Sequence, residues 1–90
     1  MGREIRKAPP KATIPEGWRI DSSRNNDYEM IQEPTGMTVT IDHVKRRAYP
    51  GYGNRDGQPI NDIVYSGRGW RDRMITDAVA HLQKLRGYIR

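Results

Sequence analysis

An alternation of apolar and polar residues in the middle of the chain places the strongest constraint on its fold. Residues 37–42 read Met-Thr-Val-Thr-Ile-Asp, so every second side chain is apolar. That two-residue period is typical of a strand with one buried face. The Pro-Thr-Gly sequence at 34–36 favours a hairpin turn that joins this strand to residues 28–33. Turn residues at 42–45 lead into a further strand at 46–49, so the pattern predicts a three-stranded antiparallel meander.

Two further segments are candidate strands. Residues 18–21 precede a polar turn-like stretch and are expected to form a short edge strand. Residues 60–65 are a candidate for a final short strand. Between the meander and this last strand, residues 50–59 hold three Gly and two Pro, which excludes regular structure. Ordered loops of this length are often functional, so the loop is a candidate contact region.

Near the end of the chain, apolar residues recur at spacings of four, four, four and three, which predicts an amphipathic helix over 68–86. The stripe consists of Trp70, Met74, Ala78, Leu82 and Leu85, flanked by Ile75 and Val79. Ser66 is expected to cap the start of the helix and Gly87 to end it. Lys84 and Arg86 then lie at the negative end of the helix dipole, where cations are stabilising.

Together these elements predict an α+β fold: a three- to four-stranded antiparallel β-meander with one C-terminal amphipathic helix packed on one face. The other face is expected to be open to solvent, to a partner or to a second copy. The supply of core residues is small, because the 90-residue chain has no Phe and only two Leu. Trp, Tyr and Met side chains must supply the missing volume. A core this thin predicts a small stability margin, and a homodimer is one way to complete it.

The N-terminal segment differs in composition from the rest of the chain. Residues 1–16 are rich in Pro and charge without a helical or alternating period, so they are expected to form a flexible basic arm ahead of one domain over 17–90. The chain has no Cys, which excludes disulfides and cysteine-based zinc sites. No apolar run has the length of a signal peptide core or a membrane span. A cytoplasmic protein without a membrane partner is the expectation.

The formal net charge of +5 is unevenly distributed along the chain. The arm carries +2, residues 17–66 carry −1 and residues 67–90 carry +4. This distribution favours an anionic partner, either nucleic acid or an acidic protein. The alternative is a solvated basic face that keeps a small protein soluble.

An arginine-rich stretch lies at the expected start of the helix. Residues 66–73 read Ser-Gly-Arg-Gly-Trp-Arg-Asp-Arg, and the two glycines allow the backbone to approach a ligand. The unpaired N–H groups of a first helical turn, with guanidinium groups nearby, form a candidate phosphate site. The alternative is an ordinary entry to the helix anchored by Trp70, and the spacing of a P-loop is absent. The candidate nucleic-acid or anion-binding residues are Arg46, Arg47, Arg68, Arg71 and Arg73.

Aromatic residues and arginines are interleaved around the glycine-rich loop. The candidate residues for base stacking or for a protein interface are Tyr49, Tyr52 and Tyr65, with Arg55 in the same stretch. Such a mixture stacks on unpaired bases in single-strand-binding proteins. Tyr and Arg are equally common anchors of protein interfaces, and the tyrosines can also pack the loop onto the sheet. The residues alone leave these three alternatives open.

No group of residues in the sequence is typical of a catalytic centre or a metal site. Asp77 and His81 are one helical turn apart, but two ligands do not make a metal site and no third is indicated. Asp42 and His43 lie at a predicted turn, where both residue types are common for local reasons. Asp42 and Lys45 are one residue too far apart for a PD-(D/E)xK nuclease motif. A non-enzymatic protein without a metal or cofactor is the expectation.

Two resemblances bear on function. The hairpin from Gly17 to Ile41 resembles the sheet of small interferase toxins with a double-stranded-RNA-binding-domain-like fold. The arm lacks the N-terminal helix of that family, and Asn-Asn-Asp at 25–27 stands where its catalytic histidine is expected, so the resemblance implies no activity. The stretches 39–42, 46–49 and 67–79 resemble small accessory proteins encoded by bacteriophages and prophages, which implies binding rather than catalysis.

The leading expectation is a small basic protein that binds nucleic acid, largely through phosphate contacts from the candidate arginines. The alternative is a phage-type inhibitor or adaptor that binds a protein through an exposed sheet face or the tyrosine-rich loop. A third is a structural component that works as an oligomer. A continuous basic groove in the folded protein would favour nucleic acid. Scattered arginines beside an exposed apolar patch would favour a protein partner.

Overall fold

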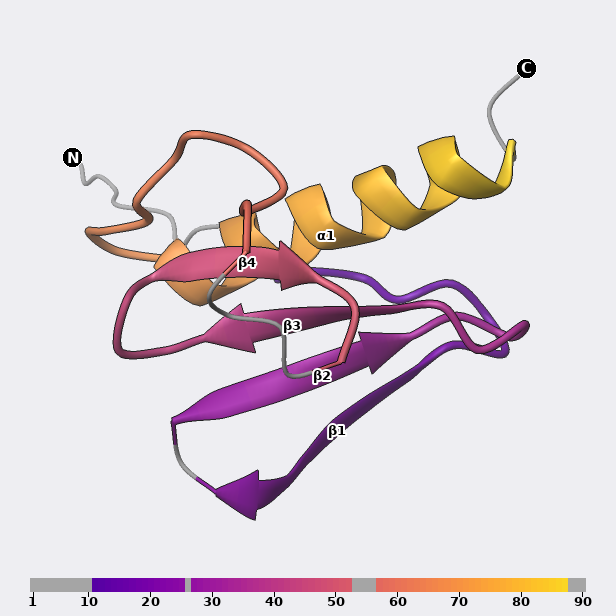
Figure 1. Cartoon of the computed structure of the whole chain (residues 1–90). Coiled ribbons are helices and arrows are strands. Elements are labelled where there is room, and N and C mark those ends of the chain that lie inside the picture. Colours follow the sequence, from indigo (N-terminus) through magenta and orange to yellow (C-terminus); the bar gives the residue numbers. More distant parts are fainter. Residues whose placement is uncertain (1–10, 26, 53–56, 88–90) are drawn as a thin grey trace, which may run out of the picture.

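The computed structural model describes residues 11–25, 27–52 and 57–87, apart from the side chains of residues 23–25. Its strands are β1 (Arg19–Asn25), β2 (Tyr28–Gln32), β3 (Thr38–Asp42) and β4 (Arg47–Pro50), followed by helix α1 (Trp70–Arg86). The strands form one antiparallel sheet in the order β1-β2-β3-β4, so each pairs with its neighbour in sequence. The helix packs on one face of this sheet (Figure 1). The predicted α+β fold is confirmed.

The strand register places the apolar members of the alternating pattern beneath the helix. Ile31 lies opposite Val39, and Ile41 lies opposite Ala48. These four side chains are completely buried and form one cluster with the buried face of α1. Because side chains alternate across a strand, the same register places Thr40 and its cross-strand partners, Met30 and Tyr49, on the other face.

The helix follows its predicted stripe except at the two ends. Its buried residues are Met74, Ile75, Ala78, Val79 and Leu82. Leu85, expected in the stripe, is 58 % exposed, because the helix extends past the edge of its contact with the core. Gly87 ends the helix in the left-handed conformation at φ +75°, as predicted, and its N–H bonds the carbonyls of Gln83 and Lys84. The expected cap at Ser66 is wrong: the N-cap is Gly69, also left-handed, without a side-chain cap.

The face of the sheet away from α1 is not open over its centre, which corrects the prediction. Met30, Thr40 and Tyr49 lie on this face and are at most 6 % exposed. The hydroxyl of Thr40 donates to the carbonyl oxygen of Gly51 at 2.7 Å, which draws the segment after β4 over the sheet. In Figure 1 the coloured segment that leaves β4 turns down from the end of this strand. The chain itself thus covers the centre of a surface that was expected to be open to solvent, to a partner or to a second copy.

The segment 60–65 was expected to be a strand, and this is wrong. Two backbone hydrogen bonds tie it to β4 and to the turn before it, from the Ile60 N–H to Ala48 and from the Tyr65 N–H to Arg46, each at 2.8 Å. Between them, the Asn61 side chain accepts the N–H of Ile63 at 2.9 Å, which bends the chain away from regular pairing. The sheet gains its fourth strand from β1 instead.

Part of the N-terminal arm packs against the helix. Residues 11–16 run alongside α1, and the Ala12 N–H donates to Asp72 Oδ1 at 2.9 Å (Figure 1). Ala12, Ile14 and Trp18 are partly buried against the core. Residues 1–10, the rest of the expected flexible arm, lie outside the described residues. Within the described part of the chain, α1 has neither the length nor the apolar character needed to cross a membrane.

Candidate functional site: the start of helix α1

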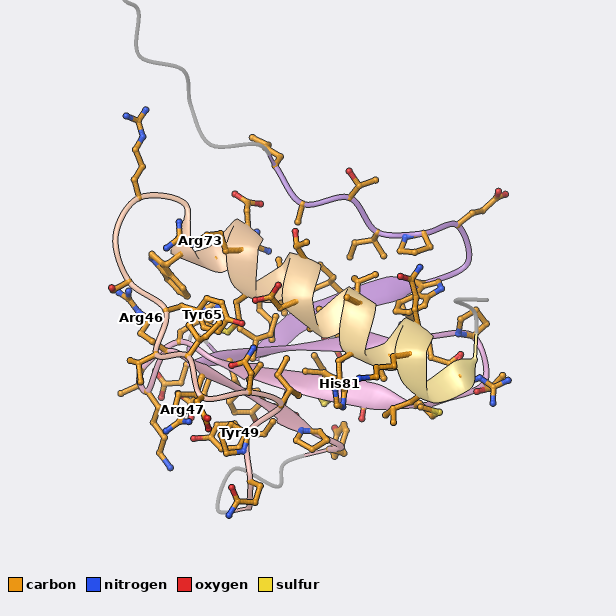
Figure 2. All side chains as sticks on the ribbon, turned by 90° about the horizontal axis from the view of Figure 1, so that it is seen from above. Arg46, Arg47, Tyr49, Tyr65, Arg73 and His81 are labelled. Atoms are coloured by element: carbon orange, nitrogen blue, oxygen red, sulfur yellow. The ribbon has the colours of Figure 1, made fainter. Side chains whose placement is uncertain are left out.

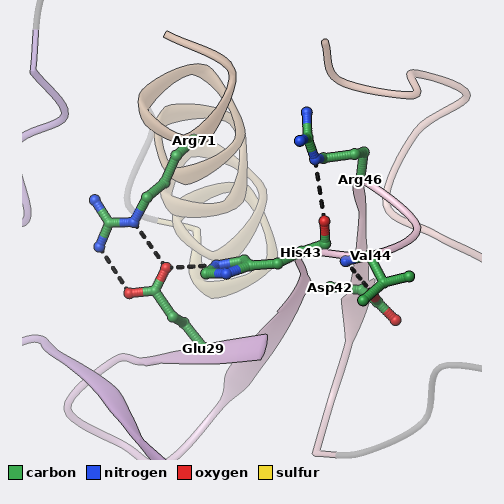
Figure 3. A network of polar contacts seen from close by, with 6 residues as sticks. All are labelled: Glu29, Asp42, His43, Val44, Arg46 and Arg71. Atoms are coloured by element: carbon green, nitrogen blue, oxygen red, sulfur yellow. Dashed lines mark hydrogen bonds and ion pairs between the residues drawn. The ribbon is translucent and has the colours of Figure 1, made fainter. Parts of the chain in front are cut away.

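The carboxylate of Glu29 connects the sheet to the start of α1. Glu29 on β2 is only 4 % exposed. Arg71 forms a bidentate ion pair with it, at 2.8 Å from Nε to Oε1 and 2.7 Å from Nη2 to Oε2 (Figure 3). His43 Nε2 lies 2.8 Å from the same Oε1 atom. This pairing compensates for the removal of the carboxylate from water.

The protonation of Glu29 follows from these partners. The hydrogen bonds from Arg71 lower the pKa of Glu29 and outweigh burial of the carboxyl group, which raises it. The hydrogen bond with His43 lowers the pKa further. The carboxyl group is therefore ionised at neutral pH, as the ion pair with Arg71 requires.

Two side chains of the β3–β4 turn surround the indole of Trp70, the first residue of α1. The His43 ring meets the indole edge-on, with 5.4 Å between ring centroids and 83° between ring planes. The Arg46 guanidinium carbon lies 3.9 Å from the indole centroid, a stacked cation–π arrangement. Arg46 Nε also donates to the His43 carbonyl at 3.0 Å (Figure 3).

The turn that positions these side chains is held by Asp42. Its Oδ1 atom accepts the N–H groups of Val44 at 2.9 Å and Lys45 at 2.8 Å, the local pattern for which aspartate is favoured in turns. Arg46 then adopts a left-handed backbone, at φ +61°. Local turn roles were predicted for both Asp42 and His43. That role holds for Asp42, whereas His43 also reaches across to Glu29.

Most of the candidate arginines are engaged within the protein. Arg71 is paired with Glu29, and Arg46 stacks on Trp70. Arg73 donates to the carbonyl oxygens of Arg68, at 2.5 Å, and Ser66. Arg47 donates to the Asn61 carbonyl at 3.3 Å, while its Nε atom is buried without a hydrogen-bond partner in the described part of the chain. The exposed Arg68 guanidinium has no hydrogen bond or ion pair with any described residue.

The three candidate tyrosines differ in exposure. Tyr49 and Tyr65 are buried, at 4 % and 2 % exposure, and only Tyr52 presents a large surface, at 57 %. The Tyr65 hydroxyl donates to Asp77 Oδ2 at 2.5 Å and accepts from the Asn61 side chain at 2.8 Å. Burial, reinforced by the bond to Asp77, raises the pKa of Tyr65 to about 12. Base stacking on Tyr49 or Tyr65 would require these rings to leave the core. Arg55 lies outside the described residues.

Asp77 and His81 do not form a joint site. Asp77 is the acceptor for Tyr65, and burial, followed by the nearby charge of Lys84, lowers the pKa of His81. The part of the chain that the structure describes has no group of three or more His, Asp or Glu side chains able to hold a metal ion.

A groove of about 530 Å³ lies beside the first two turns of α1. We call it the helix-start groove. One wall is the segment 63–66, in which the neighbouring side chains Ile63 and Val64 are 47 % and 58 % exposed. Its cationic residues are Lys11, Arg68 and Arg73, and its helix side is lined by Asp72, Thr76 and Asp77.

The main features of this region were not predicted from the sequence. Ile63 and Val64 were expected in a strand, and Lys11 was not related to the helix. The consecutive apolar residues next to the arginine-rich stretch were the signal in the sequence that could have found this groove.

Comparison of the chain with protein-family models, curated proteins and solved structures finds no match.

Proposed function

We propose that the protein binds a partner protein through the helix-start groove. The observation that carries this proposal is the pair Ile63 and Val64, adjacent apolar side chains left half exposed on the wall of a concave surface. Concave apolar surfaces with a charged rim are typical of binding sites. Burial of both side chains against a partner would remove their apolar surface from water, which is favourable.

The placement of the arginines favours protein over nucleic acid. Arg71 is neutralised by Glu29, and Arg73 folds back on backbone carbonyls. Carboxylates are interleaved with the cations, since Asp72 lies between Arg71 and Arg73 in sequence and lines the same groove as Arg73. A phosphate backbone is negative along its whole length and would meet these carboxylates as well as the guanidinium groups, whereas a protein segment can place one carboxylate at the cations and neutral groups elsewhere.

Selection from a random peptide display library on the immobilised full chain tests the proposal. We expect enriched peptides that bind the unaltered protein and bind a Val64→Asp variant at least about tenfold more weakly, because the carboxylate would be buried against apolar peptide groups. Binding is measured by fluorescence anisotropy of the labelled peptides.

Val44→Asp is the matched control. Val44 is also an exposed valine, at 71 %, but it lies on the β3–β4 turn outside the groove. The control variant should bind the peptides like the unaltered protein. Circular dichroism and thermal unfolding of both variants establish that they are folded. Enriched peptides that ignore Val64→Asp would show that the groove is not the binding site.

Nucleic-acid binding is a second candidate, because several guanidinium groups gather at one end of the molecule. Arg46, Arg47 and Arg73 lie toward the same end in Figure 2. Their contacts among the described residues are with neutral groups, so no ion pair there offsets their positive charge. Titration of labelled duplex DNA and single-stranded RNA at low and near-physiological salt tests it. Saturable binding with a steep salt dependence, weakened by Arg68→Ala, would support this candidate. An absence of binding at low salt would exclude nucleic-acid binding as the function.

A further inference from the structure

We infer that the docking segment of the partner is a short extended peptide in which an apolar side chain lies next to an Asp or Glu. This inference rests on the proposed protein-binding function of the helix-start groove and specifies the chemistry that the groove recognises.

Each carboxylate of the groove accepts a hydrogen bond from within the protein. Asp72 Oδ1 accepts the Ala12 N–H at 2.9 Å, and Asp77 Oδ2 accepts the Tyr65 hydroxyl at 2.5 Å. These bonds direct both acids toward neighbours within the protein. A basic ligand group would meet the three cations of the groove, Lys11, Arg68 and Arg73, as well as these carboxylates, so the groove is poorly suited to a basic peptide.

The cations of the groove are available. Lys11 and Arg68 line it, and neither side chain has a hydrogen bond or ion pair with a described residue. Arg73 donates to two carbonyl oxygens and forms no ion pair with a described residue. The three cations exceed the two carboxylates of the groove, Asp72 and Asp77, and this excess of positive charge favours a single carboxylate from the ligand, which Arg68 can bind in a bidentate manner.

The backbone of the wall offers a place for an extended chain. The Tyr65 N–H is bonded inward to Arg46, at 2.8 Å. The N–H and C=O groups of the preceding residue, Val64, have no hydrogen-bond partner in the described parts of the chain. Exposed and unpaired main-chain groups of this kind pair with an extended peptide, which then places alternate side chains on the same surface.

The apolar wall determines the kind of side chain that the ligand carries next to its carboxylate. Ile63, Val64 and the methyl-bearing Thr76 line the groove beside the cations. A peptide paired with Val64 therefore brings an apolar side chain against these residues and a carboxylate, one or two positions along, within reach of Arg68 and Lys11. Figure 2 shows Arg73 projecting at this end of the helix, next to the segment that carries Tyr65.

A change of charge at Arg68 tests this chemistry. Random peptide selections are run in parallel on the unaltered full chain, on Arg68→Glu and on Arg19→Glu, with folding of each protein checked by circular dichroism. We expect an apolar-plus-acidic consensus on the unaltered protein. On Arg68→Glu the preference should change from acidic to basic, and the original peptides should bind about tenfold more weakly.

Arg19→Glu is the control for net charge. Arg19 is exposed and lies on β1, away from the groove, and its substitution changes the total charge by the same amount. A loss of the acidic preference on both variants would trace it to the overall charge and overturn the inference. Peptides that depend on Val64 without an acidic preference would overturn the inference while leaving the proposed function in place. Failure to obtain any peptide sensitive to Val64→Asp would overturn both.

Discussion

Glu29 is the residue on which the junction between sheet and helix depends. Its carboxylate is buried, and the charge is stabilised by Arg71 across 42 residues of sequence and by His43 across 14. Burial of a charge is costly unless partners replace the water that solvated it. Removal of Arg71 is therefore expected to cost more than the loss of one surface ion pair.

We expect Arg71→Met to lower the free energy of unfolding by about 1–2 kcal/mol at pH 7, a value reduced from that of fully buried pairs because Arg71 is partly exposed. The effect should depend on pH. The pKa of Glu29 is lowered in the folded protein, mainly by Arg71, so the ion pair contributes stability above the usual carboxyl pKa of 4.5 and loses it as the pH falls through the folded-state pKa. The difference between variant and unaltered protein should shrink below pH 4. Urea denaturation at pH 7 and pH 3 measures it.

Arg68→Met is the matched control for this prediction. Arg68 is exposed and has no ion pair among the described residues, so its substitution should change stability by less than about 0.5 kcal/mol at either pH. An equal loss from both substitutions, or a loss from Arg71→Met that stays constant to pH 3, would contradict the role given to the pair.

The ion pair between Glu29 and Arg71 could be predicted from the sequence only in part. The alternation along residues 28–33 does place Glu29 on the same face as Ile31. It does not show which cation lies above that face, because Arg71 reaches it only through the packing of the helix. The arginine pattern was instead interpreted as a phosphate site, since an arginine bonded to a buried carboxylate and an arginine facing solvent look alike in sequence.

At the level of elements, periodic segments were predicted well and irregular ones were not. The strands expected at 28–33 and 37–42 differ from β2 and β3 by one residue at one end, and the strand expected at 46–49 is shifted by one residue from β4, because burial fixes the period of each. The segment 60–65 was misassigned, because the Asn61 side chain competes with strand pairing for the Ile63 N–H. β1 extends to Asn25 through polar residues, where the pairing is irregular between Asp21 and Asn25.

Two leucines on α1 give a matched test of the helix packing. Leu82 is 1 % exposed, whereas Leu85, one turn later, is 58 % exposed. Leu82→Ala should lower the free energy of unfolding by about 2–4 kcal/mol, because it leaves a cavity under the helix. Leu85→Ala should cost less than about 0.5 kcal/mol. Urea denaturation compares the two, and similar losses would mean that α1 packs with a different face toward the sheet.

At the scale of the whole molecule, the shortage of large apolar residues is met by covering the sheet from both sides. The helix and residues 11–18 cover one face, while the segment after β4 covers the centre of the other. The exposed apolar side chains that remain include Ile63 and Val64 on the helix-start groove. The arm is thereby linked to the proposed function, because its Ala12–Asp72 hydrogen bond holds Lys11 at the same groove.

This arrangement predicts that a small change in the N-terminal segment lowers the stability of the entire domain. Ile14 is partly buried against the core, whereas its neighbour Thr13 is exposed. Ile14→Ala should lower the free energy of unfolding by about 1 kcal/mol, in proportion to the apolar area it removes from a half-buried site. Thr13→Ala should leave stability unchanged within about 0.5 kcal/mol. Because a domain of this size has little stability to spare, Ile14→Ala should also shift the thermal midpoint by several degrees. Thermal and urea unfolding of both variants measure this, and equal behaviour would show that the segment does not contribute to the folded core.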